Sequence, residues 1–157
     1  MSDDWRTDRV GAALRGQNPT VLRRMTAGFA VIGDNQFLPG YCVLITDDVA
    51  ADRLTDLPRA TRLAFLDDMD ALGDAVQRVC SQRDPAFRRI NYEILGNYDA
   101  FLHAHIWPRY GWEPDDNRSR PVWSYPPHLR KQPEAALGPQ HDGLRRDLTE
   151  ALSSLGR

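Results

Sequence analysis

Hydrophobic and polar positions recur with two different periods along the chain, and these periods predict its secondary structure. Two short runs rich in β-branched and aromatic residues, at residues 27–32 and 41–45, are separated by the turn-like sequence GDNQFLPG. This arrangement predicts two antiparallel strands with a connection at residues 33–40. Two further runs, at residues 89–95 and 101–107, enclose the loop GNYDA and predict a second pair of strands.

A helical period follows the first pair of predicted strands. Apolar residues recur at steps of three and four from Leu57 to Cys80, which indicates one apolar stripe on a long helix. The stripe consists of Phe65, Met69, Leu72, Val76 and Val79. Thr55 or Asp56 is the expected N-cap, with Pro58 in the first turn.

Two shorter helices are also expected. Asn18 followed by Pro19 resembles a helix start and predicts a short helix toward Met25. Leucines between residues 144 and 155 predict a final helix, whereas residues 108–139 contain seven of the 11 prolines and should be irregular. We therefore expect one α+β domain over residues 1–157, with an antiparallel sheet covered on one face by helices.

Composition narrows the possible functions. The 20 basic and 22 acidic side chains give a formal charge of −2, which argues against a nucleic-acid partner. No apolar run approaches the roughly 20 residues that span a bilayer, and the start MSDDWRTDRV is too polar for a secretory signal. Cys42 and Cys80 lie in apolar surroundings typical of buried free thiols. A cytoplasmic protein without a membrane partner is expected.

His103 and His105 are the strongest candidates for chemistry. Alternate residues of a strand point to the same face, so the two imidazoles should lie side by side on an open face of the sheet. Leu102, Ala104 and Ile106 should then face the helices. The pair alone leaves three interpretations: two strand histidines without chemistry, a nucleophilic site, or a Zn²⁺ or Fe²⁺ site completed by Glu93 and His128.

The surrounding sequence favours the nucleophilic site. The segment that runs from Gly96-Asn97 through Phe101-Leu-His103-Ala-His105 to Pro108-Arg109 resembles the signature of the histidine triad (HIT) family. The resemblance covers roughly residues 20–110 and departs from the family pattern at the first histidine, where Phe101 stands. Residues 111–157 match nothing general to the family, although PVWSYP resembles a bacterial branch related to diadenosine tetraphosphate hydrolases.

The resemblance implies covalent catalysis on a nucleotide. His103 would attack the α-phosphate, and water would then release a nucleoside monophosphate. The main-chain carbonyl of His105 would orient His103, and the His105 side chain would contact the scissile phosphate. Asn97 stands at the position of the family glutamine and would donate its amide to a phosphate oxygen. A histidine is missing at Phe101, so activity should be altered rather than abolished.

The same resemblance assigns the residues around the substrate. Asp34, beside the family's ribose-binding position at Gly33, would hold the ribose. The further candidates for substrate contact are Gln36, Asn91, Phe101 and Arg109. For Asp34 and Gln36 the alternative is a turn residue that bonds its own backbone, and for Arg109 it is a solvated arginine at a strand end. The aromatic residues Trp107, Trp112, Trp123 and Tyr125 would stack on a second base, close a dimer, or simply pack.

No cofactor is implied, and a homodimer that pairs through the long helix and its neighbouring strand is expected. Two other functions remain open at this point: a metal-dependent enzyme with the two histidines as ligands, and a catalytically weak nucleotide-binding module. The leaving group also stays open, because diadenosine polyphosphates, nucleoside phosphoramidates, adenylylated amines and nucleotide sugars all present the same α-phosphate.

Overall fold

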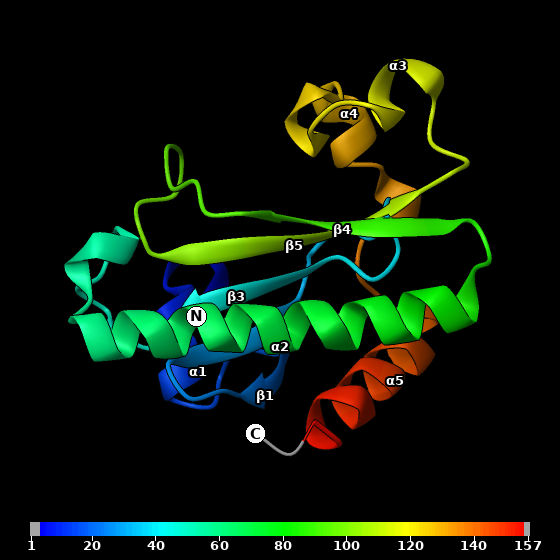
Figure 1. Cartoon of the computed structure of the whole chain (residues 1–157). Coiled ribbons are helices and arrows are strands. Elements are labelled where there is room, and N and C mark those ends of the chain that lie inside the picture. The colour runs from blue at the N-terminus through cyan, green and yellow to red at the C-terminus, as the bar shows by residue number, and fades with distance from the viewer. Residues whose placement is uncertain (1–3, 156–157) are drawn as a thin grey trace.

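A five-stranded antiparallel sheet forms the centre of the computed structural model, which describes residues 4–155 (Figure 1). Its strand order is β1-β2-β3-β5-β4. The strands are β1 (Val21–Arg24), β2 (Gly28–Ile32), β3 (Cys42–Thr46), β4 (Phe87–Glu93) and β5 (His103–Tyr110). Both expected strand pairs are present, and β3 joins them by pairing with β5. The predicted α+β class is confirmed.

Helices α2 (Arg59–Arg83) and α5 (Asp142–Ser153) cover one face of the sheet (Figure 1). Phe65, Leu72 and Val76 of the predicted stripe are fully buried against the sheet residues Ala104 and Ile106, which are also fully buried. The long helix and its apolar stripe are therefore confirmed, and the core lies between this face and α2.

The predicted cap of α2 is wrong. Pro58 occupies the N-cap position without a side-chain hydrogen bond. The Asp56 carboxylate instead accepts the backbone N–H groups of Asp52 and Arg53, so it stabilises the preceding turn. The Asp56 carboxylate therefore has its hydrogen-bond donors within this turn and does not cap α2.

The N-terminal region also differs from the prediction. A helix, α1, spans Arg9–Leu14, and the segment expected to form a helix after Asn18 is strand β1. The Asn18 side chain accepts the Thr20 N–H at 3.0 Å, which turns the chain into an extended segment that pairs with β2. Helix α1 lies on the face opposite α2, where its Val10 packs in a second apolar cluster with Phe29 and Ile45.

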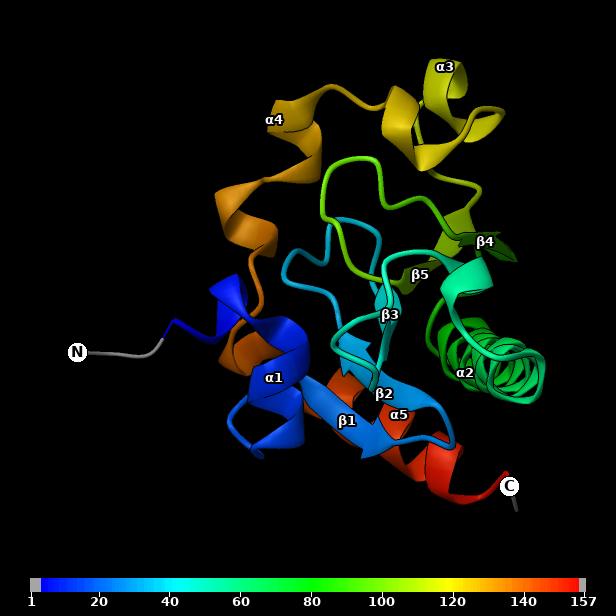
Figure 2. The ribbon, with the colours of Figure 1, turned by 90° about the vertical axis from the view of Figure 1, so that its left-hand side faces the viewer.

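Residues 111–141, here called the strap, arch over the same face (Figures 1 and 2). The strap was expected to be irregular, and it consists of short helical turns, including α3 (Asp115–Arg118) and α4 (Pro127–Arg130). Backbone hydrogen bonds of 2.7 Å from Gln36 N–H to the Ala135 carbonyl and 2.8 Å from Leu137 N–H to the Asp34 carbonyl attach it to the β2–β3 connection. The face expected to be open is therefore covered.

Two smaller expectations concern the whole chain. Cys42 and Cys80 are free and buried, as predicted. Within residues 4–155, no helix combines the length and the apolar character needed to cross a membrane.

Candidate active site

His103 and His105 lie side by side on β5, on the face opposite α2. Their ring centroids are 4.9 Å apart with an interplanar angle of 80°, and the residues are 7% and 8% exposed. The Phe101 ring lies 4.5 Å from the His103 ring and packs against the apolar cluster under α1. The strand alternation thus places the two imidazoles together, as the sequence predicts.

A main-chain carbonyl orients His103. Its Nδ1 lies 2.6 Å from the carbonyl oxygen of Phe101, and a carbonyl can only accept, so Nδ1 carries the proton. In the neutral ring, this arrangement puts the lone pair on Nε2. The expected partner, the carbonyl of His105, is wrong. His105 lies inside β5, where backbone carbonyls are directed toward the neighbouring strands, whereas Phe101 precedes β5 and its carbonyl can accept from the His103 ring.

His105 has a different Nδ1 partner, the hydroxyl of Tyr41 at 2.7 Å. Burial, together with the neighbouring His103, lowers the pKa of His105 from 6.5 to about 3. His105 is therefore neutral near pH 7. Burial and the nearby Asp34 raise the pKa of the Tyr41 hydroxyl well above its ordinary value of 10.0, so this hydroxyl keeps its proton.

Aromatic rings enclose His105. Tyr41 stacks on Trp107 with centroids 3.5 Å apart and planes at 5°. Trp123 of the strap meets His105 edge to face at 5.2 Å, and its indole N–H donates to the Glu93 carboxylate at 2.6 Å. The indole N–H of Trp107 is buried and has no acceptor among the described residues. These rings restrict access to His105 and keep its surroundings apolar.

The predicted ribose contacts, on the β2–β3 connection, are engaged with other residues of the chain. Asp34 forms an ion pair with Arg9 at 2.5 Å and lines a cavity of about 290 Å³ beside Trp5. The Gln36 amide bonds the carbonyls of Gly33 and Tyr41, so it holds the connection in shape. The Gln36 contacts match the alternative in which a turn residue bonds its own backbone, whereas the Asp34 carboxylate pairs with Arg9 of α1.

The Tyr41 ring lies directly on the backbone at Gly33. A Cβ atom at Gly33 would come within 2.1 Å of Cδ1 of Tyr41. Gly33, the position that the resemblance associates with ribose binding, therefore has no room for a side chain, and Tyr41 fills the space that such a side chain would need.

Arg109 is a structural residue rather than a free cation. It is 3% exposed, and all five of its N–H donors have protein acceptors. Its Nε and Nη2 groups donate to the buried Glu113 carboxylate. That carboxylate also accepts a hydrogen bond from the Tyr125 hydroxyl at 2.7 Å. The Nη1 group of Arg109 donates to the Asn91 amide oxygen at 2.8 Å. Every donor is thus engaged within the chain, which matches neither the phosphate contact nor the solvated arginine considered from the sequence, and Arg109 instead holds the strap.

Asn97 is exposed in the connection between β4 and β5. Its side chain makes no hydrogen bond with the residues at positions 4–155. The site geometry thus rests on His103, His105 and Tyr41.

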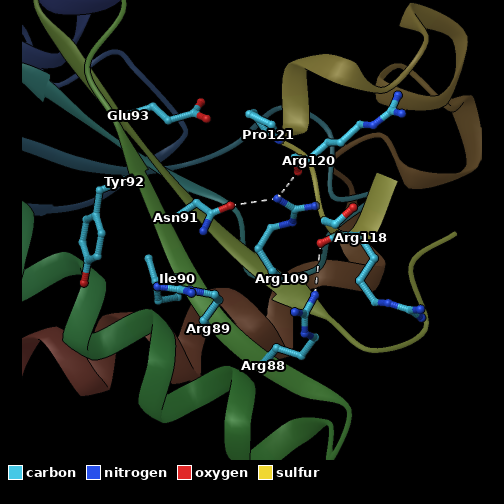
Figure 3. A pocket seen from close by; sticks show the side chains of 11 residues that line it. Arg88, Arg89, Ile90, Asn91, Tyr92, Glu93, Arg109, Arg118, Arg120 and Pro121 are labelled. Atoms are coloured by element: carbon cyan, nitrogen blue, oxygen red, sulfur yellow. Dashed lines mark hydrogen bonds between the residues drawn. The ribbon is translucent and has the colours of Figure 1, made fainter. Parts of the chain in front are cut away.

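A cavity of about 500 Å³ runs along the free edge of β4 (Figure 3). Asn91 and Glu93, the cross-strand neighbours of Trp107 and His105, line it together with arginines of β4 and of the strap. Figure 3 shows Arg109 reaching from β5 to Asn91 and to the carbonyl of Arg120. Neither this cavity nor the one beside Asp34 is lined by the two histidines.

The metal interpretation lacks a ligand set in the part of the chain that the structure describes. Over residues 4–155, no three His, Cys, Asp or Glu side chains converge as metal ligands would. Of the proposed ligands, Glu93 is held by Trp123, and His105 uses its Nδ1 on Tyr41.

Two residues of this site escaped the sequence interpretation. The sequence interpretation places Tyr41 only in a strand. In strand alternation it lies on the same face as Val43 and Ile45, which pair with His105 and His103. Glu113 lies just beyond the segment that resembles the family. The spacing of four residues between Arg109 and Glu113 is the only signal that links them, and it is common on protein surfaces.

Comparisons with known proteins give matches in structure alone. No family model matches the sequence, and no curated protein does. A histidine triad protein from Marinobacter aquaeolei has a TM-score of 0.68 at 19% identity, over 86% of this chain and 89% of that one. A HIT protein from Sinorhizobium meliloti gives 0.68 at 16% identity, over 83% and 87%.

A third solved structure extends the match. It is described as a hypothetical histidine triad nucleotide-binding protein from Sulfolobus tokodaii, with a TM-score of 0.67 at 14% identity over 94% of this chain and 93% of that one. The three matches agree with the arrangement of sheet and long helix described above. Over most of its length, this chain therefore has the fold of histidine triad proteins.

Proposed function

We propose that the protein is a nucleotide hydrolase or nucleotidyl transferase of HIT type that acts on a diadenosine polyphosphate-like substrate. The observation that carries the proposal is the 2.6 Å contact between Nδ1 of His103 and the Phe101 carbonyl. In a neutral imidazole, a proton held on Nδ1 in this way leaves the Nε2 lone pair available as a nucleophile. The nucleotide-binding description of the Sulfolobus tokodaii structure supports the same substrate class.

The chemistry follows in two steps. Nε2 of His103 bonds to the α-phosphorus while the bond from phosphorus to the leaving oxygen breaks, and the leaving group departs with the bond electrons. His105 stabilises charge on the phosphate oxygens. Water then attacks the nucleotidyl-His103 intermediate, the P–N bond breaks with its electrons returning to Nε2, and a nucleoside monophosphate leaves; in a transferase another acceptor attacks and leaves carrying the nucleotidyl group. The attacking water gives its proton to solvent.

The absence of the first histidine is compatible with this mechanism. Residue 101 orients His103 through its main-chain carbonyl, which is the same for any residue type. The Phe101 side chain instead fills an apolar site under α1. Asn97, Asp34 and Asn91 lie outside the histidine pair. In this proposal they contact the parts of the substrate that extend beyond the α-phosphate.

The experiment compares nucleoside monophosphate release by the wild type, His103→Ala and His105→Ala on a panel that includes diadenosine tetraphosphate and an adenosine phosphoramidate. His103→Ala should lose at least about 10⁴-fold in turnover, because no other group can form the intermediate. His105→Ala should lose about 10²–10³-fold. The exposed His128 offers a control, His128→Ala, with unchanged turnover.

Two outcomes would contradict the proposal. Binding of the panel by the wild type without release of nucleoside monophosphate would indicate a nucleotide-binding module. Equal collapse of both histidine variants, with stoichiometric metal lost from each, would indicate a metalloenzyme.

We further propose that the protein forms a homodimer through α2 and β4. Strand β4 is at an edge of the sheet, so its outer hydrogen-bonding groups have no strand partner among residues 4–155. Leu63 on α2 is 50% exposed and Tyr92 on β4 is 45% exposed. Light scattering should give twice the 17.8 kDa chain mass, and a mass of one chain at all concentrations would contradict the dimer.

A further inference from the structure

The two imidazoles of the site make different contacts through the same atom. Nδ1 of His103 faces a carbonyl, which can only accept, whereas Nδ1 of His105 faces the Tyr41 hydroxyl, which can donate or accept. The direction of the second hydrogen bond decides where His105 carries its proton. It therefore decides which chemistry His105 offers to a bound phosphate.

The Tyr41 hydroxyl has one partner. Nδ1 of His105 is its only hydrogen-bond partner among residues 4–155. If Nδ1 carried the proton, the hydroxyl would accept, and its own hydrogen would point into the aromatic enclosure without an acceptor. An unsatisfied polar group of this kind costs about 1–3 kcal/mol. Donation from Tyr41 to Nδ1 avoids that cost.

Packing holds the hydroxyl in this direction. The Tyr41 ring is stacked on Trp107 at 3.5 Å on one side and lies against Gly33 on another. The ring therefore has little freedom to swing its hydroxyl away from His105. Burial also keeps this hydroxyl protonated, since it raises the pKa of Tyr41 far above neutrality.

We propose that Tyr41 is a positioning residue that holds His105 as the neutral tautomer with its proton on Nε2. His105 then donates a hydrogen bond from Nε2 to a substrate oxygen, while the neighbouring His103 presents an unprotonated Nε2. The two adjacent imidazoles have complementary tautomers, one a nucleophile and the other a donor. No proton leaves His105, because a phosphate leaving group departs as an anion. This role in catalysis rests on the proposed function, although the tautomer itself does not.

The test measures the tautomer directly by ¹⁵N NMR of the histidine side chains in the full chain. In the wild type we expect His105 to have an unprotonated Nδ1 and a protonated Nε2, and His103 to show the opposite pattern. In Tyr41→Phe, which keeps the stacked ring, His105 should become a mixture of tautomers while His103 stays unchanged. A wild-type His105 with its proton on Nδ1 would overturn the proposal, and so would an unchanged His105 in Tyr41→Phe.

A matched variant controls for the loss of a tyrosine hydroxyl. The Tyr110 hydroxyl donates to the Pro39 carbonyl, with no contact to either histidine, so Tyr110→Phe should leave the His105 tautomer unaltered. With a substrate that the wild type turns over, Tyr41→Phe should lower kcat about tenfold with little change in KM, as expected for one weakened transition-state hydrogen bond. A tautomer result as expected, with no turnover of any substrate, would contradict the proposed function and leave the positioning role intact.

Discussion

The two faces of the sheet are built on different principles. The side of β5 that faces α2 is apolar and buried, with Ala104 and Ile106 at 0% exposure. The opposite face carries His103, His105 and Trp107 on the same strand, covered by the strap. Residues that are neighbours in sequence therefore alternate between a packed core and a site in which each imidazole bonds one specific partner through Nδ1.

This difference explains why the histidine face requires a separate cover. An apolar face packs through complementary shape and buried area alone. Imidazoles in an apolar enclosure also need hydrogen-bond partners that the surrounding structure keeps in place. The strap provides this cover through a buried ion pair, Arg109–Glu113, at 2.8 Å. The two faces should consequently respond differently to substitution.

The strap anchor should give the largest loss of stability. Glu113→Gln removes a buried carboxylate and leaves the Arg109 charge without its partner, which should cost about 3–5 kcal/mol in the free energy of unfolding. Asp115→Asn is the control, since its carboxylate pairs with Arg118 at the surface and should contribute less than about 1 kcal/mol. Urea unfolding measures both, and equal effects would show that the strap is not anchored by the buried pair.

The second prediction compares one substitution on each face. Ile106→Ala leaves a cavity in the core under α2 and should lower the free energy of unfolding by about 2–5 kcal/mol. Trp123→Ala removes edge-to-face contacts from a residue that is 41% exposed, and should cost about 1–2 kcal/mol while exposing His105. A larger loss for Trp123→Ala in urea unfolding would contradict the division between the two faces.

The third prediction concerns pH. His105 has a pKa of about 3 in the folded state and an ordinary value of 6.5. Between these two pH values His105 is protonated in the unfolded chain and neutral in the folded chain. The stabilisation is therefore present above pH 6.5 and is lost as the pH falls toward 3. The slope from this residue should not exceed about 1.4 kcal/mol per pH unit.

A pair of histidine variants isolates this contribution. His105→Gln should flatten the pH dependence of urea unfolding between pH 6.5 and 4, whereas His128→Gln should not, because His128 is exposed. Identical pH profiles for the wild type and His105→Gln would show that His105 is not held neutral by the fold.

The smallest effect is expected at Phe101, where the sequence departs from the signature that it resembles. Phe101→His keeps the carbonyl that orients His103, so turnover should change by less than about tenfold, the effect of one hydrogen bond. A rise of several powers of ten would show that the missing histidine, rather than the main chain, limits the wild type.

The fold was predictable from the sequence where hydrophobic residues recur with a regular period. The alternation around His103 and the stripe from Phe65 to Val79 each placed a face correctly, because burial enforces these periods. The helix expected after Asn18 failed because an asparagine before a proline starts a turn as readily as a helix, and pairing with β2 decided the outcome.

The site was predictable only in part, for a related reason. His103 and His105 come from one strand, so their proximity follows from local geometry. Tyr41 and Trp123 come from segments far away in the chain, and no local pattern indicates that they meet His105. The position of the carbonyl that orients His103 also depended on where β5 begins, which lies beyond the reach of periodicity.

The most direct test of the central claim is to trap the covalent intermediate. The protein is mixed with a substrate that it turns over, quenched within one turnover and digested, and the histidine-containing peptides are examined by mass spectrometry. We predict a nucleotidyl group on His103 alone, absent from His103→Ala and still present in His105→Ala at a lower rate. Turnover without any adduct on His103, or an adduct on His105, would contradict the account.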